Sequence, residues 1–176
     1  ARTPLQFAPK LSKELGRNIW LKREDLQDVF SFKIRGAANR IAALKDDEKA
    51  RGVCAASAGN HAQGVAASAQ LLGMPATIVM PSDAPRIKLE RTRGYGATVI
   101  TYDRETEDRD AIAGDLCSKS GATFVHPYND VGVIAGQGTV GLEMAAQAAA
   151  LGLHLDDVLA CTGGGGLSSG IALALE

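Results

Sequence analysis

Apolar positions along the chain fall into short runs that alternate with longer stretches of helical composition. The short runs are rich in β-branched residues and predict strands, while the longer stretches predict helices. The expected strands are Ile19–Lys22, Val53–Ala56, Thr77–Met80, Thr98–Tyr102, Thr123–Val125 and Val158–Cys161. The expected helices are Phe32–Leu44, His61–Leu72, Arg86–Arg93, Thr106–Lys119 and Val131–Ala150, with a last helix beginning near Leu167. This alternation predicts an α/β fold with a mainly parallel sheet and helices on its faces.

Glycines stand at the joints of this pattern, near the points where a helix should stop and a strand should follow. They are Gly52, Gly73, Gly96, Gly121 and Gly152. In open parallel sheets, ligands bind beyond the carboxyl ends of the strands. The loops that follow the predicted strands are therefore the places to search for chemistry.

Composition narrows the class of protein. The chain has 176 residues, of which 45 % are hydrophobic and 22 % charged, and a formal net charge of −1. These values are typical of a globular protein and give no long-range attraction to nucleic acid or to acidic lipid. The first residues have no apolar core of the signal-peptide type, and no apolar run reaches the ~20 residues of a membrane span. We therefore expect a cytoplasmic protein without nucleic-acid or membrane partners.

The three cysteines, Cys54, Cys117 and Cys161, form no C-x-x-C pair and stand beside apolar or small residues. They are expected to be reduced, packed thiols. His126 and His154 lack metal-ligand spacing with any cysteine or carboxylate pair, so no metal site is expected.

The first candidate site surrounds Lys33, at the start of a predicted helix and between apolar Phe32 and Ile34. Desolvation and a helix N-terminus both disfavour the ammonium form of a lysine, which turns its amine into a nucleophile and base. The alternative is a surface lysine on an amphipathic helix.

The second candidate is the loop Ser57, Ala58, Gly59, Asn60 and His61, between a predicted strand and a predicted helix. Free backbone N–H groups at a helix N-terminus and the Ser57 hydroxyl suit a carboxylate, and the Asn60 amide suits a ring oxygen. The alternative is that Ser57 or Asn60 only caps the helix.

The third candidate is the run Gly163, Gly164, Gly165 and Gly166, followed by Leu167. Consecutive glycines lose much conformational freedom on folding, and a plain turn needs only one or two. Four in a row let the backbone wrap around an anion at the N-terminus of the next helix. This pattern predicts a phosphate cradle. It is not a nucleotide P-loop, because no Lys-Ser or Lys-Thr pair follows the glycines.

A fourth pattern suggests a different chemistry. Gly136, Gly138 and Gly141 fit G-x-G-x-x-G, and Asp156 follows at a distance compatible with a dinucleotide fold. The apolar run before them is short, however, and the glycines are followed directly by more helix. We interpret them as small residues that let a helix pack closely. A dinucleotide-dependent oxidoreductase stays as a less favoured alternative.

Together, these segments resemble the fold-type-II pyridoxal-phosphate enzymes, and their order is similar to that of the threonine/serine dehydratases, also called threonine ammonia-lyases. The resemblance runs from Thr3 to the last residue. It is carried by "KRED" at 22–25, "SFKIRGA" at 31–37, "SAGNHAQGVA" at 57–66, "VMP" at 79–81, "VIAGQGT" at 133–139 and "TGGGGL" at 162–167.

The resemblance implies roles for individual residues. Lys33 falls at the position of the Schiff-base lysine, next to Phe32, and Asn60 at that of the asparagine that contacts the cofactor's phenolic oxygen. Residues 163–167 fall at the loop that binds the phosphate of pyridoxal 5'-phosphate. Residues 57–61 correspond to the loop that grips the substrate carboxylate.

The resemblance also implies two three-layer α/β domains with mainly parallel sheets, as in the β subunit of tryptophan synthase. Residues 52–129 would form a smaller, mobile domain, and residues 1–51 and 130–176 a larger cofactor domain that is incomplete in this chain. The family continues beyond Glu176, where further strands, the partner of the pyridine nitrogen and any cation site or regulatory domain are expected. The missing neighbours should leave apolar faces of Val131–Ala150 and Leu167–Leu175 uncovered.

The implied activity is the dehydration and deamination of a small hydroxy amino acid to a 2-oxo acid and ammonia. Isoleucine biosynthesis is one metabolic setting for it. The resemblance also implies a homo-oligomer, either a dimer or a tetramer. Threonine, serine and 3-hydroxyaspartate remain open as substrates. The similar serine racemases typically carry a serine where this chain has Ala58, which predicts elimination without efficient racemisation. A truncated fragment without catalytic activity is a further alternative.

Overall fold

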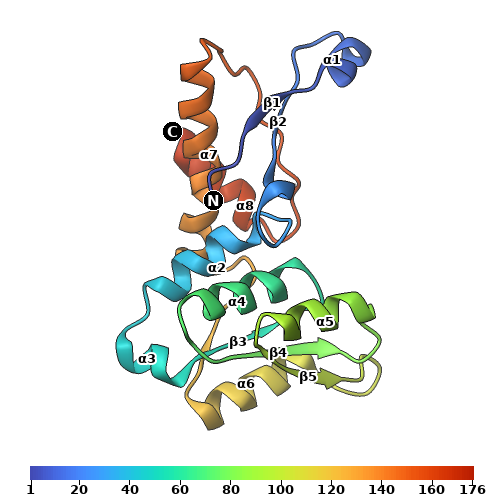
Figure 1. Ribbon diagram of the computed structural model, residues 1–176, viewed down its shortest axis with the longest axis vertical. Coiled ribbons are helices and arrows are strands. Elements are labelled where there is room, and N and C mark those ends of the chain that lie inside the picture. The colour runs from blue at the N-terminus through green and yellow to red at the C-terminus, as the bar shows by residue number, and fades with distance from the viewer.

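The computed structural model describes residues 1–176 and has a tall shape with two parts (Figure 1). The lower part is a parallel sheet between helices. The upper part contains a two-stranded hairpin and a pair of helices from the C-terminal end of the chain. Helix α2 (Lys33–Ala42) lies where the two parts meet.

The sheet has four parallel strands in the spatial order β5-β4-β3-β6. Their bounds are Val53–Ala56 for β3, Ala76–Pro81 for β4, Thr98–Tyr102 for β5 and Thr123–Phe124 for β6. Consecutive strands run outward from β3 to β5, and β6 then pairs on the other side of β3. The predicted α/β class with a mainly parallel sheet is confirmed.

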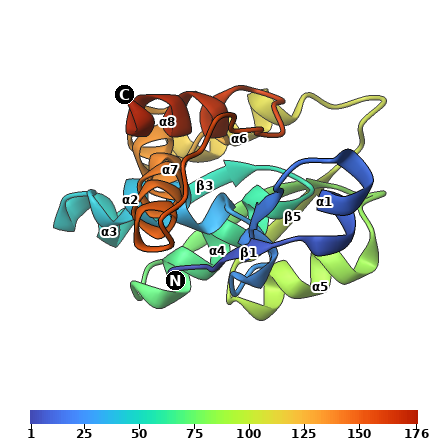
Figure 2. The same cartoon turned by 90° about the horizontal axis from the view of Figure 1, so that it is seen from above.

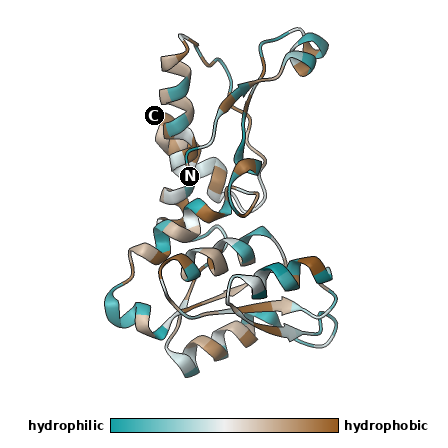
Figure 3. Ribbon diagram, viewed as in Figure 1, coloured by the Kyte–Doolittle hydropathy of each residue, from teal (hydrophilic) through white to brown (hydrophobic).

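Helices cover both faces of this sheet (Figure 2). Helices α4 (Asn60–Leu71) and α5 (Arg86–Gly94) lie on one face, and α6 (Arg109–Ser120) lies on the other. Apolar residues concentrate in the strands and on the inward sides of these helices (Figure 3). The larger core unites α2, α4 and one face of the sheet, whereas a smaller cluster of five buried residues lies under α6. The short helix α3 (Asp46–Arg51) precedes β3.

The upper part is built on α7 (Val131–Ala150) and α8 (Gly166–Leu175). The Asp130 side chain caps α7 by accepting a hydrogen bond from the Val133 amide at 3.0 Å. An antiparallel pair, β1 (Leu5–Phe7) and β2 (Trp20–Lys22), brackets the small helix α1 (Pro9–Leu15). None of the helices is long and apolar enough to cross a membrane.

The G-x-G-x-x-G glycines lie in the middle of α7, where they allow helices to touch. A Cβ on Gly136 would come within 2.5 Å of the Arg35 carbonyl oxygen on α2, and one on Gly138 within 2.8 Å of the Gly170 carbonyl oxygen on α8. Gly141 packs against Ile171 in the same way. These residues open no loop and no helix N-terminus, so the packing interpretation is confirmed.

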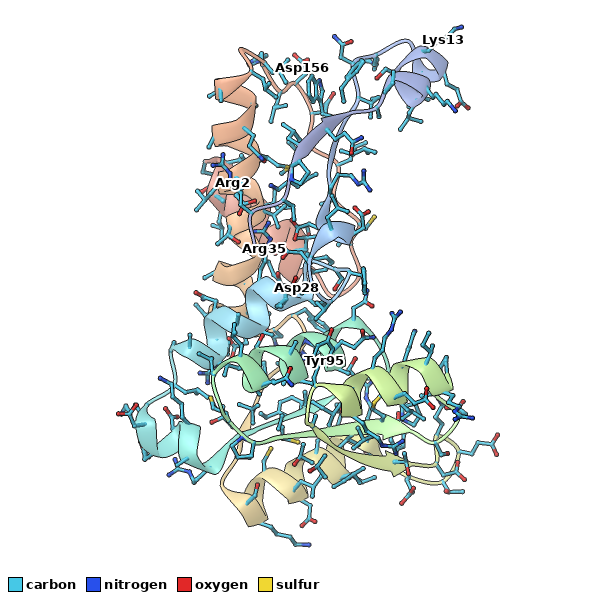
Figure 4. All side chains as sticks on the ribbon, viewed as in Figure 1. Arg2, Lys13, Asp28, Arg35, Tyr95 and Asp156 are labelled. Carbon is cyan, nitrogen blue, oxygen red and sulfur yellow. The ribbon has the colours of Figure 1, made fainter.

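A buried ion cluster forms around Arg35, whose position on α2 is labelled in Figure 4. The Arg35 guanidinium pairs with Glu24, at 2.7 Å, and with Glu143 on α7, at 2.8 Å. Glu143 also pairs with Lys22 on β2, and Glu24 belongs to the 3-10 helix Glu24–Leu26 (η1). The guanidinium side chain is only 7 % exposed, so its partners replace the water that burial removes.

The helix predictions agree with the structure to within a few residues, and α7 has the expected bounds. The five glycines expected at the joints all have positive φ, as helix-ending glycines require. The short elements β1, α1, η1 and α3 were not predicted. They carry too few residues for a clear period.

The predicted strand Val158–Cys161 is wrong: this segment is irregular, and Leu159 is 95 % exposed. A strand requires a neighbour to satisfy its backbone, and no strand of the described residues lies alongside. The expected uncovered apolar faces are present, because Val131 and Leu142 on α7 and Leu173 on α8 are exposed.

The ion cluster predicts a loss of stability in acid. Burial alone would raise the pKa of Glu143, but hydrogen bonds and charge from Arg35 and Lys22 outweigh it and hold the pKa at about 2, against an ordinary 4.5. A carboxylate with a depressed folded-state pKa contributes stability above its unfolded pKa and loses it as the pH falls toward the folded one. The free energy of unfolding should therefore drop between about pH 4.5 and pH 2.

Glu143→Gln should flatten this part of the pH profile and destabilise the chain at pH 7 by about 2–4 kcal/mol, since it leaves buried cations short of a partner. Urea unfolding at a series of pH values measures both effects. Glu90→Gln, which removes an exposed ion pair with Arg86, is the control and should change little. A Glu143→Gln profile parallel to the wild-type profile would contradict the prediction.

Candidate functional site

The strand order places a topological switch between β3 and β6, because β3 leads to β4 through α4 on one face of the sheet, whereas β6 is reached from β5 through α6 on the other face (Figure 2). In open α/β sheets, the crevice at such a switch point is where ligands bind. The loop after β3 is Ser57–Gly59, which leads directly into α4, and the loop after β6 is the segment 125–130. His61 joins the two loops, since its Nε2 donates to the Val125 carbonyl oxygen at 2.8 Å.

Lys33 is the first residue of α2, and its side chain reaches this switch point. Its Nζ donates a hydrogen bond to the Pro127 carbonyl oxygen at 2.6 Å and lies 5.3 Å from the centre of the Phe32 ring. Burial lowers the pKa of the Lys33 amine from its ordinary value. The structure thus places a half-buried Lys33 at a helix N-terminus, and its role as the Schiff-base lysine stays a prediction.

The glycine run lies directly across from Lys33. Gly165 is left-handed, with φ of 85°, and caps α8, which begins at Gly166. The amides of this turn and the positive end of the α8 dipole form a ready anion site. No preceding strand delivers the run, contrary to the sequence expectation.

Lys33 and the glycine run line one cavity of about 200 Å³. Besides these residues its wall is formed by Phe32, Pro127, Tyr128, Gln137, Cys161, Leu167 and Ser168. No carboxylate lines it, so an anion placed there meets only amides, hydroxyls and one amine. This donor set fits the phosphate and the aldehyde of pyridoxal phosphate.

Tyr128 separates the glycine run from the β6 side of the cavity. Its ring lies flat against Gly164, where a Cβ would overlap three carbons of the ring. A Cβ on Gly166 would meet the Tyr128 backbone at 2.8 Å. Two of the four glycines are therefore small because Tyr128 packs on them, which is a constraint that the phosphate hypothesis did not contain.

The loop of Ser57, Ala58, Gly59 and Asn60 lies at the start of α4 and does not line this cavity. The Ser57 hydroxyl accepts a hydrogen bond from the Gly59 amide at 3.2 Å, while the Asn60 side chain is exposed and caps nothing. One turn further along α4, a Cβ on Gly64 would come within 3.1 Å of the Lys33 carbonyl carbon.

His61 is buried, and its ring is neutral at physiological pH. Desolvation lowers its pKa to about 4, against the hydrogen bond to Val125, and the nearby charges of Lys33 and His126 lower it further. Its Nδ1 is buried without a partner. His61 was expected only as part of a carboxylate-binding loop. The structure gives its side chain a second task, which is to hold the loops after β3 and β6 together.

Sequence reasoning missed Pro127, Tyr128 and Gln137. The segment His126–Tyr128 follows a predicted strand, so the rule about carboxyl ends of parallel strands pointed to it, but it carries no glycine or anion-binding pattern. Gln137 is 1 % exposed with an unpartnered Oε1, and no sequence pattern distinguishes it from other α7 residues. Cys161 is exposed on the cavity wall, so the expectation of a packed thiol is wrong there.

Comparison with known proteins identifies the class to which this fold and cavity belong. The model of the family "Pyridoxal-phosphate dependent enzyme" matches residues 1–176, and the chain belongs to that family. The residues that line the cavity fit pyridoxal phosphate, the cofactor that gives the family its name.

Individual relatives are also similar. L-threonine ammonia-lyase of Thermotoga maritima is 50 % identical over 175 residues, which cover 99 % of this chain and 43 % of the relative. L-threo-3-hydroxyaspartate ammonia-lyase of Saccharomyces cerevisiae is 46 % identical over 98 % of this chain and 52 % of the relative. The chain thus spans about half or less of the length of these curated proteins.

Two solved structures share the fold over 99 % of this chain. The processed form of threonine deaminase isoform 2 from Solanum lycopersicum has a TM-score of 0.86 at 44 % identity, with 47 % of that chain covered. Maize serine racemase has a TM-score of 0.94 at 39 % identity, with 52 % of that chain covered. The predicted fold type II and the recognised family are confirmed, and a dinucleotide oxidoreductase is excluded as the class.

The Tyr128 contact predicts different effects for neighbouring glycines. Gly164→Ala should displace the tyrosine ring and destabilise the chain by about 1–3 kcal/mol, as overpacking does. Gly163→Ala is a matched control, since nothing lies within 4 Å of its Cβ position and its φ is not positive. Chemical unfolding of both variants measures the difference. Equal stabilities would show that the ring does not restrain the glycine loop.

Proposed function

We propose that this chain is the lysine-bearing part of a pyridoxal-phosphate enzyme that removes water and ammonia from a small hydroxy amino acid, leaving a 2-oxo acid. The observation that carries the proposal is that the Lys33 amine and the glycine run at the N-terminus of α8 line the same cavity. An amine opposite an anion cradle is what this cofactor needs, because its aldehyde and its phosphate are separate groups that must be held at the same time.

Residues of this chain would hold the cofactor as follows. Amides of Gly163–Gly166 and Leu167 bind the phosphate, Lys33 holds the aldehyde carbon, and Phe32 packs beside it. Asn60 donates to the ring oxygen, which requires the start of α4 to approach the cavity. Bound pyridoxal phosphate supplies an electron sink that stabilises negative charge at the substrate α-carbon.

Lys33 acts as the base that takes the α-proton. Burial favours the uncharged amine, which is the form that accepts a proton. The Pro127 carbonyl oxygen offers the amine a resting hydrogen bond at 2.6 Å and stabilises the charged form after proton transfer. Burial favours the uncharged amine and the hydrogen bond to Pro127 favours the charged one. The amine can therefore gain or lose a proton while it stays at the same place in the site.

The substrate carboxylate binds the loop of residues 57–61 through its backbone amides and the Ser57 hydroxyl. This loop stands at the N-terminus of α4, whose dipole favours an anion. Residues 52–129 contain the whole four-stranded sheet, and we propose that they form a smaller, mobile domain. Its movement would bring the loop to the cavity and exclude water during the reaction.

Threonine is the substrate that similarity to the curated relatives favours, followed by serine and 3-hydroxyaspartate. We also propose a cytoplasmic location, supported by the three unpaired cysteines, and a homo-oligomeric assembly of the complete protein. A biosynthetic role, as in isoleucine formation, is the setting that a threonine-specific enzyme would serve.

Lys33 is tested by chemical trapping. The purified protein is incubated with sub-stoichiometric pyridoxal phosphate, reduced with borohydride and mapped by peptide mass. We expect one phosphopyridoxyl group, on Lys33, because burial lowers the pKa of its amine and so favours the uncharged, nucleophilic form. Lys33→Ala should lose the label and Lys88→Ala, on α5 outside the cavity lining, should keep it. Labels scattered over surface lysines of a folded protein, with Lys33 unmodified, would refute the proposal.

Ala58 leads to a separate prediction about reaction outcome. A methyl group at this position has no proton to deliver to the α-carbon, so the complete enzyme should eliminate water from L-serine without producing D-serine quickly. Ala58→Ser should raise the D-serine yield relative to pyruvate. Chiral chromatography of residual serine checks both proteins, and rapid D-serine accumulation by the Ala58 enzyme would overturn the argument.

A further inference from the structure

Side chains of β3 alternate between the two faces of the sheet. Val53 and Ala55 belong to the larger core on the α4 side, whereas Cys54 and Ala56 belong to the smaller cluster under α6. Cys54 is 1 % exposed and therefore points at the underside of α6.

Helix α6 places a second cysteine, Cys117, beside the cluster that contains Cys54. Ala113 is buried in the cluster that contains Cys54, and Cys117 follows one helical turn later on the same face. Cys117 packs against this cluster but is partly open to solvent. Burial first, and then the neighbouring Cys117 thiol, raise the pKa of Cys54 to about 12, so Cys54 stays a protonated thiol until its partner is oxidised.

The residue of α6 that packs deepest against β3 is small. It is Ala113, the only buried residue of α6. Ile112 and Leu116 of α6 also pack against this cluster but are only partly buried. A disulfide has an S–S length of about 2.05 Å, so bond formation requires the two sulfurs to come closer than non-bonded contact.

We propose that Cys54 and Cys117 form a redox-active dithiol, which a peroxide oxidises to a disulfide between β3 and α6. This site goes beyond the proposed lyase function, which uses neither residue. Cys161 lies far along the chain on the wall of the cavity and has no cysteine beside it.

The chemistry begins at the more accessible sulfur. The Cys117 sulfur attacks one oxygen of hydrogen peroxide, the O–O bond breaks, and the released hydroxide takes the thiol proton to become water. The Cys54 sulfur then attacks the resulting sulfenic acid, the S–O bond breaks, and a second water leaves with the Cys54 proton. Two thiols lose two electrons and two protons, and the peroxide is reduced to two waters.

The disulfide would act close to the proposed substrate loop. Cys54 is on β3, three residues before Ser57 in the loop that follows this strand, and its carbonyl oxygen accepts a hydrogen bond from the Val125 amide at 2.8 Å. Val125 in turn accepts from His61. A shift of β3 toward α6 is thereby transmitted to both loops at the switch point.

The test treats the purified full chain, as isolated and after reduction, with a small excess of hydrogen peroxide. We expect the intact mass to fall by about 2 Da and the titratable thiols to drop from three to one. Peptide mapping should place the bond between residues 54 and 117, and dithiothreitol should restore three thiols.

Cys161→Ser is the matched control and should keep the mass loss with no thiol left afterwards. Cys117→Ser should abolish the mass loss. If the variant fails to fold, the wild-type peptide map alone decides. A folded wild-type chain in which Cys117 gains about 32 Da as a sulfinic acid, while Cys54 stays a free thiol, would overturn the proposal.

Discussion

The ion pairs of Arg35 are the interaction on which the arrangement of this chain depends. The guanidinium stands two residues after Lys33 on α2 and binds carboxylates from two distant segments, η1 and α7. Removing either carboxylate leaves a buried cation short of a partner, which costs far more than an exposed ion pair contributes. The cluster therefore sets where α2 begins relative to α7. Since Lys33 is the first residue of α2, the same contacts determine where its amine can reach.

Close backbone contacts then bring the remaining groups to that amine. Glycines in α7 let α2 and α8 approach until backbone atoms touch, and α8 carries the glycine run at its N-terminus. Gly64 lets α4 approach the backbone of Lys33 in the same way. The lysine proposed as the base thus lies where several helices meet, at contacts that the absence of a side chain permits. Tyr128 fills the space that is left beside the glycine run.

The long elements could be predicted from the sequence, since helices such as α7 and strands such as β4 carry many residues of consistent period. The glycine run alone predicted a phosphate cradle, because four consecutive glycines exceed what a plain turn needs. The class of enzyme came from the resemblance of all the motifs together to a known family. The strand predicted at residues 158–161 was wrong, because an apolar run does not reveal whether a neighbouring strand is present. Tyr128 and Gln137 could not be found, because their roles come from contacts between segments far apart in sequence.

The exposure of Asn60 and the packing of Lys33 also depend on contacts between segments far apart in sequence, which sequence patterns do not describe. Propensity and spacing located the loop of residues 57–61 correctly at the start of α4, but distance from the cavity is a tertiary quantity. It depends on how the sheet-bearing part sits against α2. Sequence patterns describe elements, whereas the relative position of elements is set by which surfaces fit.

Helix α4 meets Lys33 at the backbone of residue 33 and not at its side chain, through the bare Cα of Gly64. That contact does not depend on which side chains the loop before α4 displays. A position such as 58 is therefore free to vary without moving the amine or the anion cradle. One scaffold can accordingly give rise to enzymes that share a first chemical step and differ in the product they release.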